Sequence, residues 1–566
     1  MKNARGSILL LSLSVLVIGI FAACGGGSGS SASSTENVSA LMRTGYLSNP
    51  APYIPSQCYT KTEDSEGGVH NPCYACHIES LAPNYINDAA VQLAYSLPTP
   101  ALTNHWSNLF KDRSAAFAAI GDADILAYVR ASNYLNADGS IKLVATLASV
   151  PAAWDADNNG EWNGYAPDLY LRFDDDGFDH DLQGNYTGWR AFAYYPFLGT
   201  FWPTNGSTDD VMIRLAPSFR QDESGAFSLT VYRTNLAIVE AMILRRDVTI
   251  DATDEVALNV DLDKDGTLGT ATRVTYDWAP TDGRDMSYVG LARVQQLAGA
   301  VHLAAGLFPE GTEFIHSVRY IDVDDAGNIS MAARMKELRY AIKKSWYSYS
   351  ALNMAAAEEA KEKDQFPERT RQITGSAEVG LSNGQGWTFQ SFIEDANGEL
   401  RPQTYEENVF CMGCHSGIGA TTDSNFSFPR KFGASAPNRG WYHWSQQTMV
   451  GLDEPVRSDG RNEYAYYLEQ NGAGDEFRGN GEVQAKFFNA DGSLKSDALA
   501  ALADDITFLL FPSRERAIAL NKGYRVIVQE QSYIYGRDAA VEPAVNVHQS
   551  VTEDQPTGIA TAVTGP

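Results

Sequence analysis

The sequence predicts an α+β protein in which helical and loop segments flank a large mixed, partly β-rich insertion. Three observations lead to this expectation. The chain has 566 residues, more than one small domain needs. Residues 105–150 and 332–363 carry apolar side chains at the three- and four-residue spacing of amphipathic helices. Residues 248–276 and 313–329 alternate apolar and polar side chains, which is typical of strands.

The first half of the chain is expected to change from helix to strand near residue 151. Apolar spacing predicts helix over residues 105–150. Residues 151–225 are aromatic and rich in Asp, Asn and Gly, which indicates short strands and long loops. A short helix over residues 235–245 and strands around an acidic turn over residues 248–276 are expected to follow.

The second half is expected to alternate between helices and one hairpin. An apolar, alanine-rich run predicts a helix over residues 288–307. Residues 313–329 predict a hairpin that turns at residues 324–327, where two aspartates precede Ala-Gly. Further helices are expected over residues 332–363 and near residues 496–510.

The N-terminus has the features of an export signal, which we expect over residues 1–23. Lys2 and Arg5 supply positive charge, and the residues that follow are apolar. Cys24 follows two alanines in a sequence that resembles a bacterial lipobox, in which the cysteine is lipidated. The alternative is ordinary cleavage just before an incidental cysteine. Residues 24–37 are rich in Gly and Ser and are expected to form a flexible tether to the membrane.

The composition is strongly acidic. The chain has 43 Lys and Arg against 70 Asp and Glu, for a net charge of −27 at pH 7. A surface of this sign repels nucleic acid and anionic lipid head groups, so we expect no nucleic-acid partner. It favours positively charged partners or metal ions.

Four of the six cysteines lie in two C-x-x-C-H motifs, Cys73–His77 and Cys411–His415. Cys73 and Cys76, like Cys411 and Cys414, are spaced so that two thiols on one helical turn reach both vinyl groups of one porphyrin. The histidine that follows then lies under the iron. The sequence therefore predicts two haem c groups, with His77 and His415 as proximal ligands. A thiol-redox or zinc site is the alternative, but export and the histidine in both copies favour haem.

His316 is the first candidate for a distal haem ligand. The alternation in residues 313–329 places Phe314, His316 and Val318 on one face of a strand. An imidazole on an apolar face suits a haem pocket. The alternative is a core histidine hydrogen-bonded to the backbone.

Five other side chains are candidates for the same role. Cys58 has no evident cysteine partner in the sequence, and His70 lies three residues before Cys73. His302 lies among small residues, His443 lies among aromatic residues, and Met449 is close to His443 in the sequence. A buried inert thiol or an intermolecular disulfide is the alternative for Cys58.

Asp261, Asp263 and Asp265, followed by Gly266, match the first part of an EF-hand-type calcium loop. The twelfth position holds Thr272, so the usual bidentate glutamate is missing. A weaker partial match begins at residue 155, and a third acidic turn begins at residue 174. The first loop is therefore a candidate calcium site, and the competing interpretation is a solvated acidic hairpin.

The two motifs and the lipobox resemble those of dihaem c-type cytochrome lipoproteins, which respiring and metal-reducing bacteria export. The resemblance implies electron transfer at the cell surface or in the periplasm, from an outer-membrane lipoprotein anchored by its N-terminal lipid. It implies redox proteins or an extracellular electron acceptor as partners. The expected segments are a first haem region at 38–150, the insertion at 151–330, a second haem region at 331–540 and an extended tail at 541–566.

Two other functions stay open at this point. Dihaem cytochrome c peroxidases also carry two such motifs, although in tandem small domains, so an enzyme of the peroxidase or oxygenase type is one alternative. It requires one iron with an open position. The other is a surface binding protein that uses its large insertion to recognise a ligand, with accessory haems.

Overall fold

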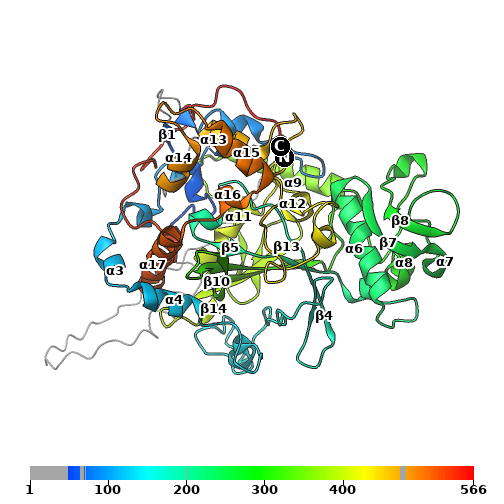
Figure 1. Cartoon of the computed structure of the whole chain (residues 1–566). Helices are drawn as coiled ribbons and strands as arrows, with labels where there is room; N and C mark the ends of the chain where they lie inside the picture. Colours follow the sequence, from blue (N-terminus) through cyan, green and yellow to red (C-terminus); the bar gives the residue numbers. More distant parts are fainter. Residues whose placement is uncertain (1–48, 64–68, 71, 200–201, 472–479, 566) are drawn as a thin grey trace, which may run out of the picture.

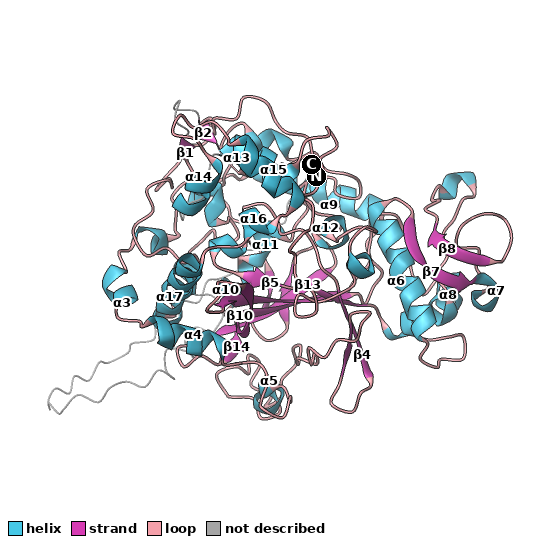
Figure 2. Cartoon of the chain, in the orientation of Figure 1, coloured by secondary structure: helices cyan, strands magenta, loops and turns pink. Residues whose placement is uncertain are grey.

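A computed structural model describes residues 49–63, 69–70, 72–199, 202–471 and 480–565. The expected signal peptide, Cys24 and the tether lie outside these residues. In the described part, no helix is both long enough and apolar enough to cross a membrane. The chain folds around a ten-stranded sheet with helices packed over it, which confirms the α+β class (Figures 1 and 2).

All pairings in this sheet are antiparallel. The strand order is β11-β12-β13-β10-β9-β6-β4-β3, with β14 beside β13 and β5 beside β9. The strands are β3 (Phe178–His180), β4 (Tyr186–Ala191), β5 (Thr208–Asp209), β6 (Met212–Arg214), β9 (Glu313–Val323), β10 (Ile329–Lys343), β11 (Thr374–Ser376), β12 (Gly380–Ser382), β13 (Trp387–Glu394) and β14 (Leu400–Pro402).

The three longest strands, β9, β10 and β13, lie side by side and separate two layers of side chains. His316, Arg339 and Ser391 are directly opposite one another in register and form a row across these strands. Because side chains alternate, the adjacent row of Ser317, Leu338 and Phe392 faces the other way. Leu338 and Phe392 pack there in a buried cluster with residues of α5. The row that contains His316 therefore faces the opposite side of the sheet.

The helices surround the sheet, and Figure 2 shows α11 and α16 over its central strands. The helices are α2 (Cys73–Cys76), α3 (Ser114–Ala118), α4 (Asp122–Arg130), α5 (Lys142–Leu147), α6 (Leu229–Leu244), α7 (Glu255–Leu258), α8 (Gly290–Leu297), α9 (Tyr349–Gln365), α10 (Tyr405–Val409), α11 (Cys411–Cys414), α12 (Ser427–Arg430), α13 (Glu463–Asn471), α14 (Gly481–Phe487), α15 (Ser496–Asp504), α16 (Thr507–Leu510) and α17 (Arg514–Glu530).

Two small sheets complete the structure. β1 (Thr62–Glu63) pairs with β2 (Val69–His70), just before the first motif. β7 (Val248–Asp254) pairs with β8 (Thr270–Val274), as expected, around the acidic turn. Figure 1 shows β7, β8, α7 and α8 in a lobe beside α6. α6 is buried over most of its length and connects this lobe to the main sheet.

Several expected helices differ from the structure. The hairpin is confirmed, but its second strand, β10, continues to Lys343, so the helix expected from residue 332 is wrong and α9 begins at Tyr349. Charged side chains in β10 are buried, but in the sequence their spacing resembles that of the polar face of a helix. The helix expected over 288–307 ends at Leu297. Residues 105–150 form several short helices, and residues 496–510 form two.

The C-terminal tail runs along the segment that carries the first motif. Within the described residues 541–565 there is no helix or strand. Isolated β-bridges join Val547 to Thr60, Ser550 to Thr103 and Pro556 to Ala94. The tail therefore packs against the N-terminal residues on both sides of the first motif.

Candidate functional site

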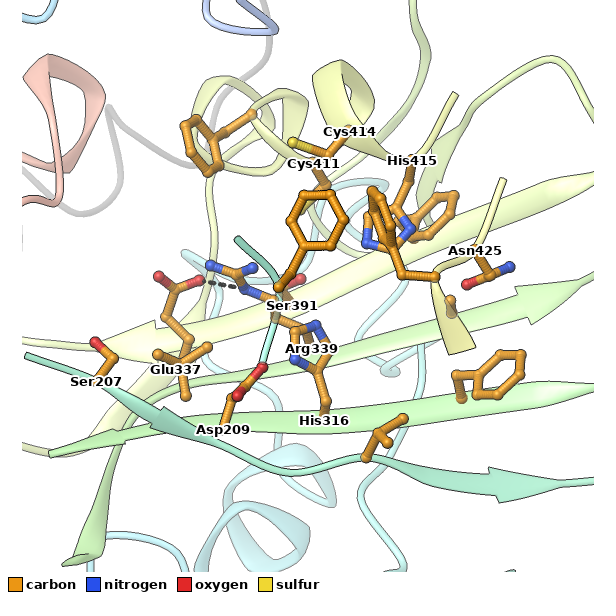
Figure 3. A pocket seen from close by; sticks show the side chains of 18 of the residues that line it. Ser207, Asp209, His316, Glu337, Arg339, Ser391, Cys411, Cys414, His415 and Asn425 are labelled. Carbon is orange, nitrogen blue, oxygen red and sulfur yellow. Dashed lines mark hydrogen bonds and ion pairs between the residues drawn. The ribbon is translucent and has the colours of Figure 1, made fainter. Parts of the chain in front are cut away.

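A large cavity lies between the second C-x-x-C-H motif and the row of His316, Arg339 and Ser391 (Figure 3). The cavity volume is about 210 Å³, and the cavity opens to solvent. This is below the 300–1,000 Å³ that is usual for small-molecule and cofactor sites. The case for a bound group therefore rests on the side chains that line the cavity.

The second motif forms the wall opposite the sheet. Thr404 and Glu407 make a capping box that starts α10, and the chain continues directly into α11. Cys411, Cys414 and His415 all line the cavity. Figure 3 shows the His415 ring on the wall that faces the sheet.

His415 is held in one tautomer by the backbone. Its Nδ1 lies 2.9 Å from the carbonyl oxygen of Ser424, and a carbonyl only accepts, so Nδ1 carries the hydrogen. The lone pair is therefore on Nε2. Burial lowers the pKa of His415 to about 4, although the Ser424 hydrogen bond opposes this shift. The ring is neutral at pH 7, as a metal ligand must be.

His316 lies on the facing wall of the same cavity, on β9. Burial lowers its pKa to about 3, and the nearby charges of Arg339 and His415 add to the shift. Two neutral imidazoles from distant parts of the sequence therefore face one cavity that is also lined by three cysteines, Cys76, Cys411 and Cys414. Among the histidines whose side chains are described, these are the two that line the cavity.

Buried charges next to His316 fix this wall. Nε of Arg339 donates to Oε2 of Glu337 at 2.9 Å, and Arg537 donates to the same oxygen at 2.8 Å. Gln403 is a third donor, also at 2.8 Å. Burial acts to raise the pKa of Glu337, but the two arginines outweigh it and lower the pKa to about 2.

The first motif forms α2, and its histidine is held by a side chain rather than by the backbone. Nδ1 of His77 lies 2.6 Å from Oδ2 of Asp88. Since a carboxylate accepts, Nδ1 again carries a hydrogen, and Nε2 is the ring nitrogen that Asp88 leaves to other partners. Asp88 is only 8% exposed. The backbone carbonyl of His77 accepts from Gln92, whose side chain also donates to the tail at Val563.

The two motifs, far apart in the sequence, lie against each other. The amide of Ala420 donates to the carbonyl of Cys76 at 3.0 Å. The amide of Gly419 donates to Oδ1 of Asp88 at 3.1 Å, across 331 residues of sequence. A Cβ at Gly419 would overlap the carbonyl oxygen of Ile78, so only glycine permits this approach. Cys76 lines the same cavity as Cys414.

The donor set of each motif fits a covalently attached haem. Each has two cysteines on one helical turn, and the described cysteines form no disulfide. Each histidine has Nδ1 hydrogen-bonded and Nε2 left for iron, the arrangement that orients metal-bound imidazoles. At the second motif, a further imidazole faces the same space.

The other expected distal ligands are placed differently. Both ring nitrogens of His443 are engaged, with Asp210 at 2.9 Å and Ser445 at 2.7 Å, so this ring has no nitrogen left for iron. Met449 is buried in an aromatic cluster away from the cavity walls. His302 lies beyond the end of α8, stacks on Trp346 and is 3.4 Å from Glu310.

Cys58 and His70 lie near the first motif in the chain. Cys58 is close enough to Cys73 and Cys414 for their charges to interact, and burial is the main cause of its raised pKa. It packs in a cluster with Trp106 and Phe410. His70 ends β2, and its side chain lies outside the described part of the structure.

The first calcium loop brings together Asp261, Asp263 and Glu255, whose ligand oxygens lie within 4.8 Å of one another. Asp265 is not in this group and instead accepts from the amide and hydroxyl of Thr267. Oδ1 of Asp261 is buried without a hydrogen-bond partner. Glu255 is 1% exposed, precedes the loop and accepts from the backbone amides of Leu262 and Gly269.

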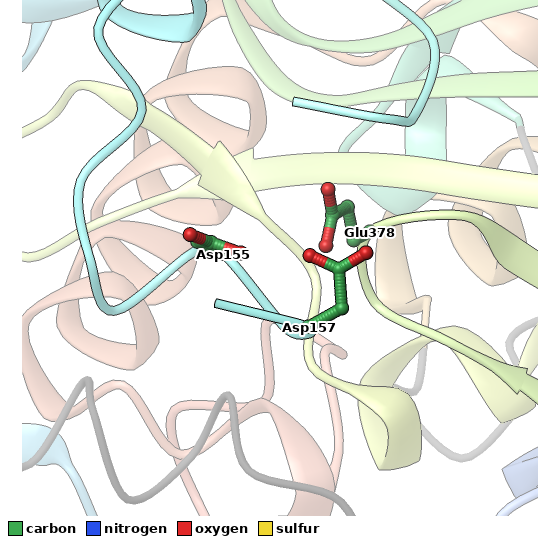
Figure 4. A group of neighbouring side chains, drawn as sticks. All are labelled: Asp155, Asp157 and Glu378. Atoms are coloured by element: carbon green, nitrogen blue, oxygen red, sulfur yellow. The ribbon is translucent and has the colours of Figure 1, made fainter. Parts of the chain in front are cut away.

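The weaker loop has the same construction. Asp155 and Asp157 lie beside Glu378, which comes from a distant segment (Figure 4). Glu378 is 1% exposed and accepts from the amides of Ala156 and Asn163 at 2.9 Å and 2.8 Å. Both loops thus pair two aspartates with one buried glutamate.

The sequence motifs did not reveal the residues that support the site. Asp88 follows His77 by eleven positions without a pattern to mark it, and Ser424 acts through its backbone. Arg339 was assigned to a helix. Alternation along β10 could have placed it on the His316 face, had its burial been known.

Comparisons with known proteins identify the family. A family model described as a lipoprotein matches residues 41–503. An uncharacterized lipoprotein of Aquifex aeolicus (strain VF5) is 31% identical over 579 residues, covering 94% of this chain and 92% of that protein. No solved structure matches the chain. The lipobox expected at Cys24 agrees with these matches, and the chain belongs to this family of lipoproteins.

Proposed function

We propose that this lipoprotein carries two covalently attached haems and transfers electrons between redox partners. The observation that carries the proposal is that His316 and His415 face one cavity together with Cys411 and Cys414. Two thiols and one imidazole are the attachment set of a c-type haem, and a second imidazole completes the coordination of its iron. When bound, each haem supplies a one-electron couple between ferric and ferrous iron.

The protein holds the ligands in the state that such coordination needs. Ser424 and Asp88 each accept from the Nδ1 of a proximal histidine and so direct Nε2 toward the iron. Burial keeps His316 and His415 neutral. An iron bound by two imidazoles has no open position, which favours electron transfer over reaction with a substrate.

The experiment is haem analysis of the purified protein and its His316→Ala variant. Mass spectrometry should show two covalently bound haems in both proteins. The variant should convert one haem from low spin to high spin in the absorption and EPR spectra. His302→Ala is the matched control, because His302 is exposed and away from the cavity, and its spectra should be unchanged. Low-spin spectra in His316→Ala would exclude His316 as a ligand.

An enzyme of the peroxidase or oxygenase type is the second candidate, and polar groups that line the cavity favour it. Tyr194 and Asp209 also line this space, and burial raises the pKa of Asp209 to about 7. Polar groups beside an iron with an open position are what oxygen chemistry requires. A stable five-coordinate haem in the unmodified protein, with turnover of peroxide, would favour the enzyme.

The location and partners follow from the lipoprotein assignment and from charge. Lipidation at Cys24 would anchor the protein to the outer membrane, facing the periplasm or the cell surface. The net charge of −27 favours a redox protein with a positive surface, or a cationic extracellular electron acceptor. Labelling with a lipid precursor, followed by membrane fractionation of a Cys24→Ala variant, tests the anchor.

Calcium at the Asp261 loop is proposed as a structural addition. Asp261, Asp263 and Glu255 offer carboxylate oxygens, which calcium prefers, and the buried Oδ1 of Asp261 lacks another partner. The site lies beside β7 and β8, away from the motifs, so calcium there would stabilise the lobe.

A further inference from the structure

We propose that the two haems form an adjacent pair of unequal reduction potential, in which the haem at Cys73–His77 has the lower potential and Asp88 is the positioning residue responsible. This inference rests on the proposed function. The inference adds a direction to the proposed electron transfer, since electrons would pass from the first haem to the second.

The contacts between the motifs carry the first part of the inference. Ala420, five residues after His415, hydrogen-bonds to the carbonyl of Cys76. Gly419 packs against Ile78 without room for a Cβ. Cys76 and Cys414 line one cavity. Porphyrins bonded to Cys76 and to Cys414 would border the same cavity, so electrons would need no intermediate carrier between them.

The two proximal histidines differ in the group that accepts their Nδ1 hydrogen. His77 donates to a carboxylate at 2.6 Å, whereas His415 donates to a neutral carbonyl at 2.9 Å. A carboxylate acceptor gives the imidazole partial anionic character, which makes it a stronger electron donor to iron. A stronger donor stabilises ferric iron and lowers the potential of the first haem.

The burial of Asp88 adds to this effect. Its carboxylate is almost fully buried, so solvent screens it little. At the second motif, the group that accepts from His415 is an uncharged carbonyl. The difference in charge between these two acceptors therefore lowers the potential of the first haem relative to the second.

With both haems bound, transfer between them would need no other reactant, since the electron lost at the first motif would be the one gained at the second. Asp88 and Ser424 hold the Nδ1 hydrogens of His77 and His415, so this transfer would not require a proton to move.

Asp88 is well placed to be tested because it touches both motifs. Oδ2 accepts from His77 and Oδ1 accepts from the amide of Gly419. Asp88→Asn retains the size of the side chain and an oxygen that can accept one of these hydrogen bonds, but removes the charge. The variant thus separates the electrostatic role of Asp88 from its structural role.

The experiment is a redox titration of the two-haem protein, monitored by absorption, for the unmodified chain and for Asp88→Asn. The lower-potential component should shift to more positive potential and the higher one should stay in place. Asp138→Asn, at an exposed turn, is the control and should shift neither component. His316→Met, which alters the second haem alone, identifies which component belongs to which motif. If Asp88→Asn moves neither component, or only the higher one, the inference is overturned.

Adjacency has its own measurement, which needs no variant. EPR spectra of the fully oxidised and half-reduced protein should differ by more than the loss of one signal, because two neighbouring ferric irons couple magnetically. A fully oxidised spectrum that is the simple sum of two isolated low-spin haems would overturn the adjacent pair. Absence of covalent haem in mass spectrometry would instead overturn the proposed function itself, so the two failures are distinguishable.

Discussion

His316 on β9 and Arg339 on β10 are directly opposite each other in the register of the central hairpin. Burial is the main cause of the lowered pKa of His316, and the guanidinium adds to it. The cation thus helps to keep the imidazole neutral and available to a metal. The same cation is held in place by Glu337, so the ligand and the buried ion network form one unit.

His316→Met tests the ligand role by a change of potential. A thioether sulfur favours ferrous iron more than an imidazole does, so the second haem should remain low-spin and shift to a more positive potential. The first haem, measured in the same titration, serves as the internal reference. A high-spin product would mean that the longer side chain does not reach the iron, and an unchanged potential would mean that residue 316 does not bind it.

Glu337→Gln should destabilise the protein by about 3–5 kcal/mol at neutral pH, because two buried arginines lose their shared carboxylate. The pKa of Glu337 in the folded protein is about 2, below its ordinary value of 4.5. Its contribution is therefore complete above pH 4.5 and is lost as the pH falls toward 2.

Urea denaturation at pH 6 and pH 3 measures this effect. The difference in unfolding free energy between the unmodified protein and Glu337→Gln should shrink at the lower pH. The exposed Glu223→Gln is the control and should differ from the unmodified protein by less than about 0.5 kcal/mol at both values. A constant difference across this range would contradict the assigned ion network.

The sequence alone allows predictions for those parts of the site in which the residues concerned are close together in the chain. C-x-x-C-H is a local motif, and alternation along residues 313–323 placed His316 on the correct strand face. The helix expected from residue 332 was wrong because Arg334, Lys336 and Glu337 are charged and yet buried in β10. Their burial depends on partners from distant segments, which periodicity does not encode.

The contact between the motifs is another long-range feature. Asp88 and Gly419 meet across 331 residues, and neither belongs to a recognisable motif. The calcium loops illustrate the same limit. The expected ligand Asp265 turns toward Thr267, while Glu255 and Glu378 enter from outside the twelve-residue pattern.

Calcium should raise the melting temperature of the protein, and a chelator should lower it. A ligand that binds only the folded state at about 100 times its Kd adds about 2.7 kcal/mol. Glu255→Gln should abolish the shift, because it removes the buried carboxylate of the cluster. Asp265→Asn is the matched control, and it should retain the shift, since Asp265 lies outside the cluster. If both variants lost the calcium-dependent shift in melting temperature equally, Asp265 would be a ligand, as the EF-hand-like pattern in the sequence predicts.

Cys73→Ala and Cys414→Ala should each weaken the thioether attachment of one haem. Haem staining after denaturing electrophoresis should fall by about half if one of two equal groups is lost. Cys58→Ala is the matched control, because Cys58 lies near both motifs but outside C-x-x-C-H, and it should retain full staining. Full staining in both motif variants and in their double variant would contradict two covalent sites.

Gly419→Ala tests the contact between the motifs through packing alone. A Cβ at this position would overlap the carbonyl oxygen of Ile78, a backbone atom next to His77 that has little freedom to move. We expect a loss of about 1–3 kcal/mol in the free energy of unfolding, as for other overpacked sites. Because Ile78 adjoins a proximal ligand, the spectrum of the first haem should also change. Gly433→Ala is the matched control, since its Cβ would meet open space and its backbone tolerates alanine. A variant at residue 419 as stable as this control, with an unchanged spectrum, would show that the motifs do not meet there.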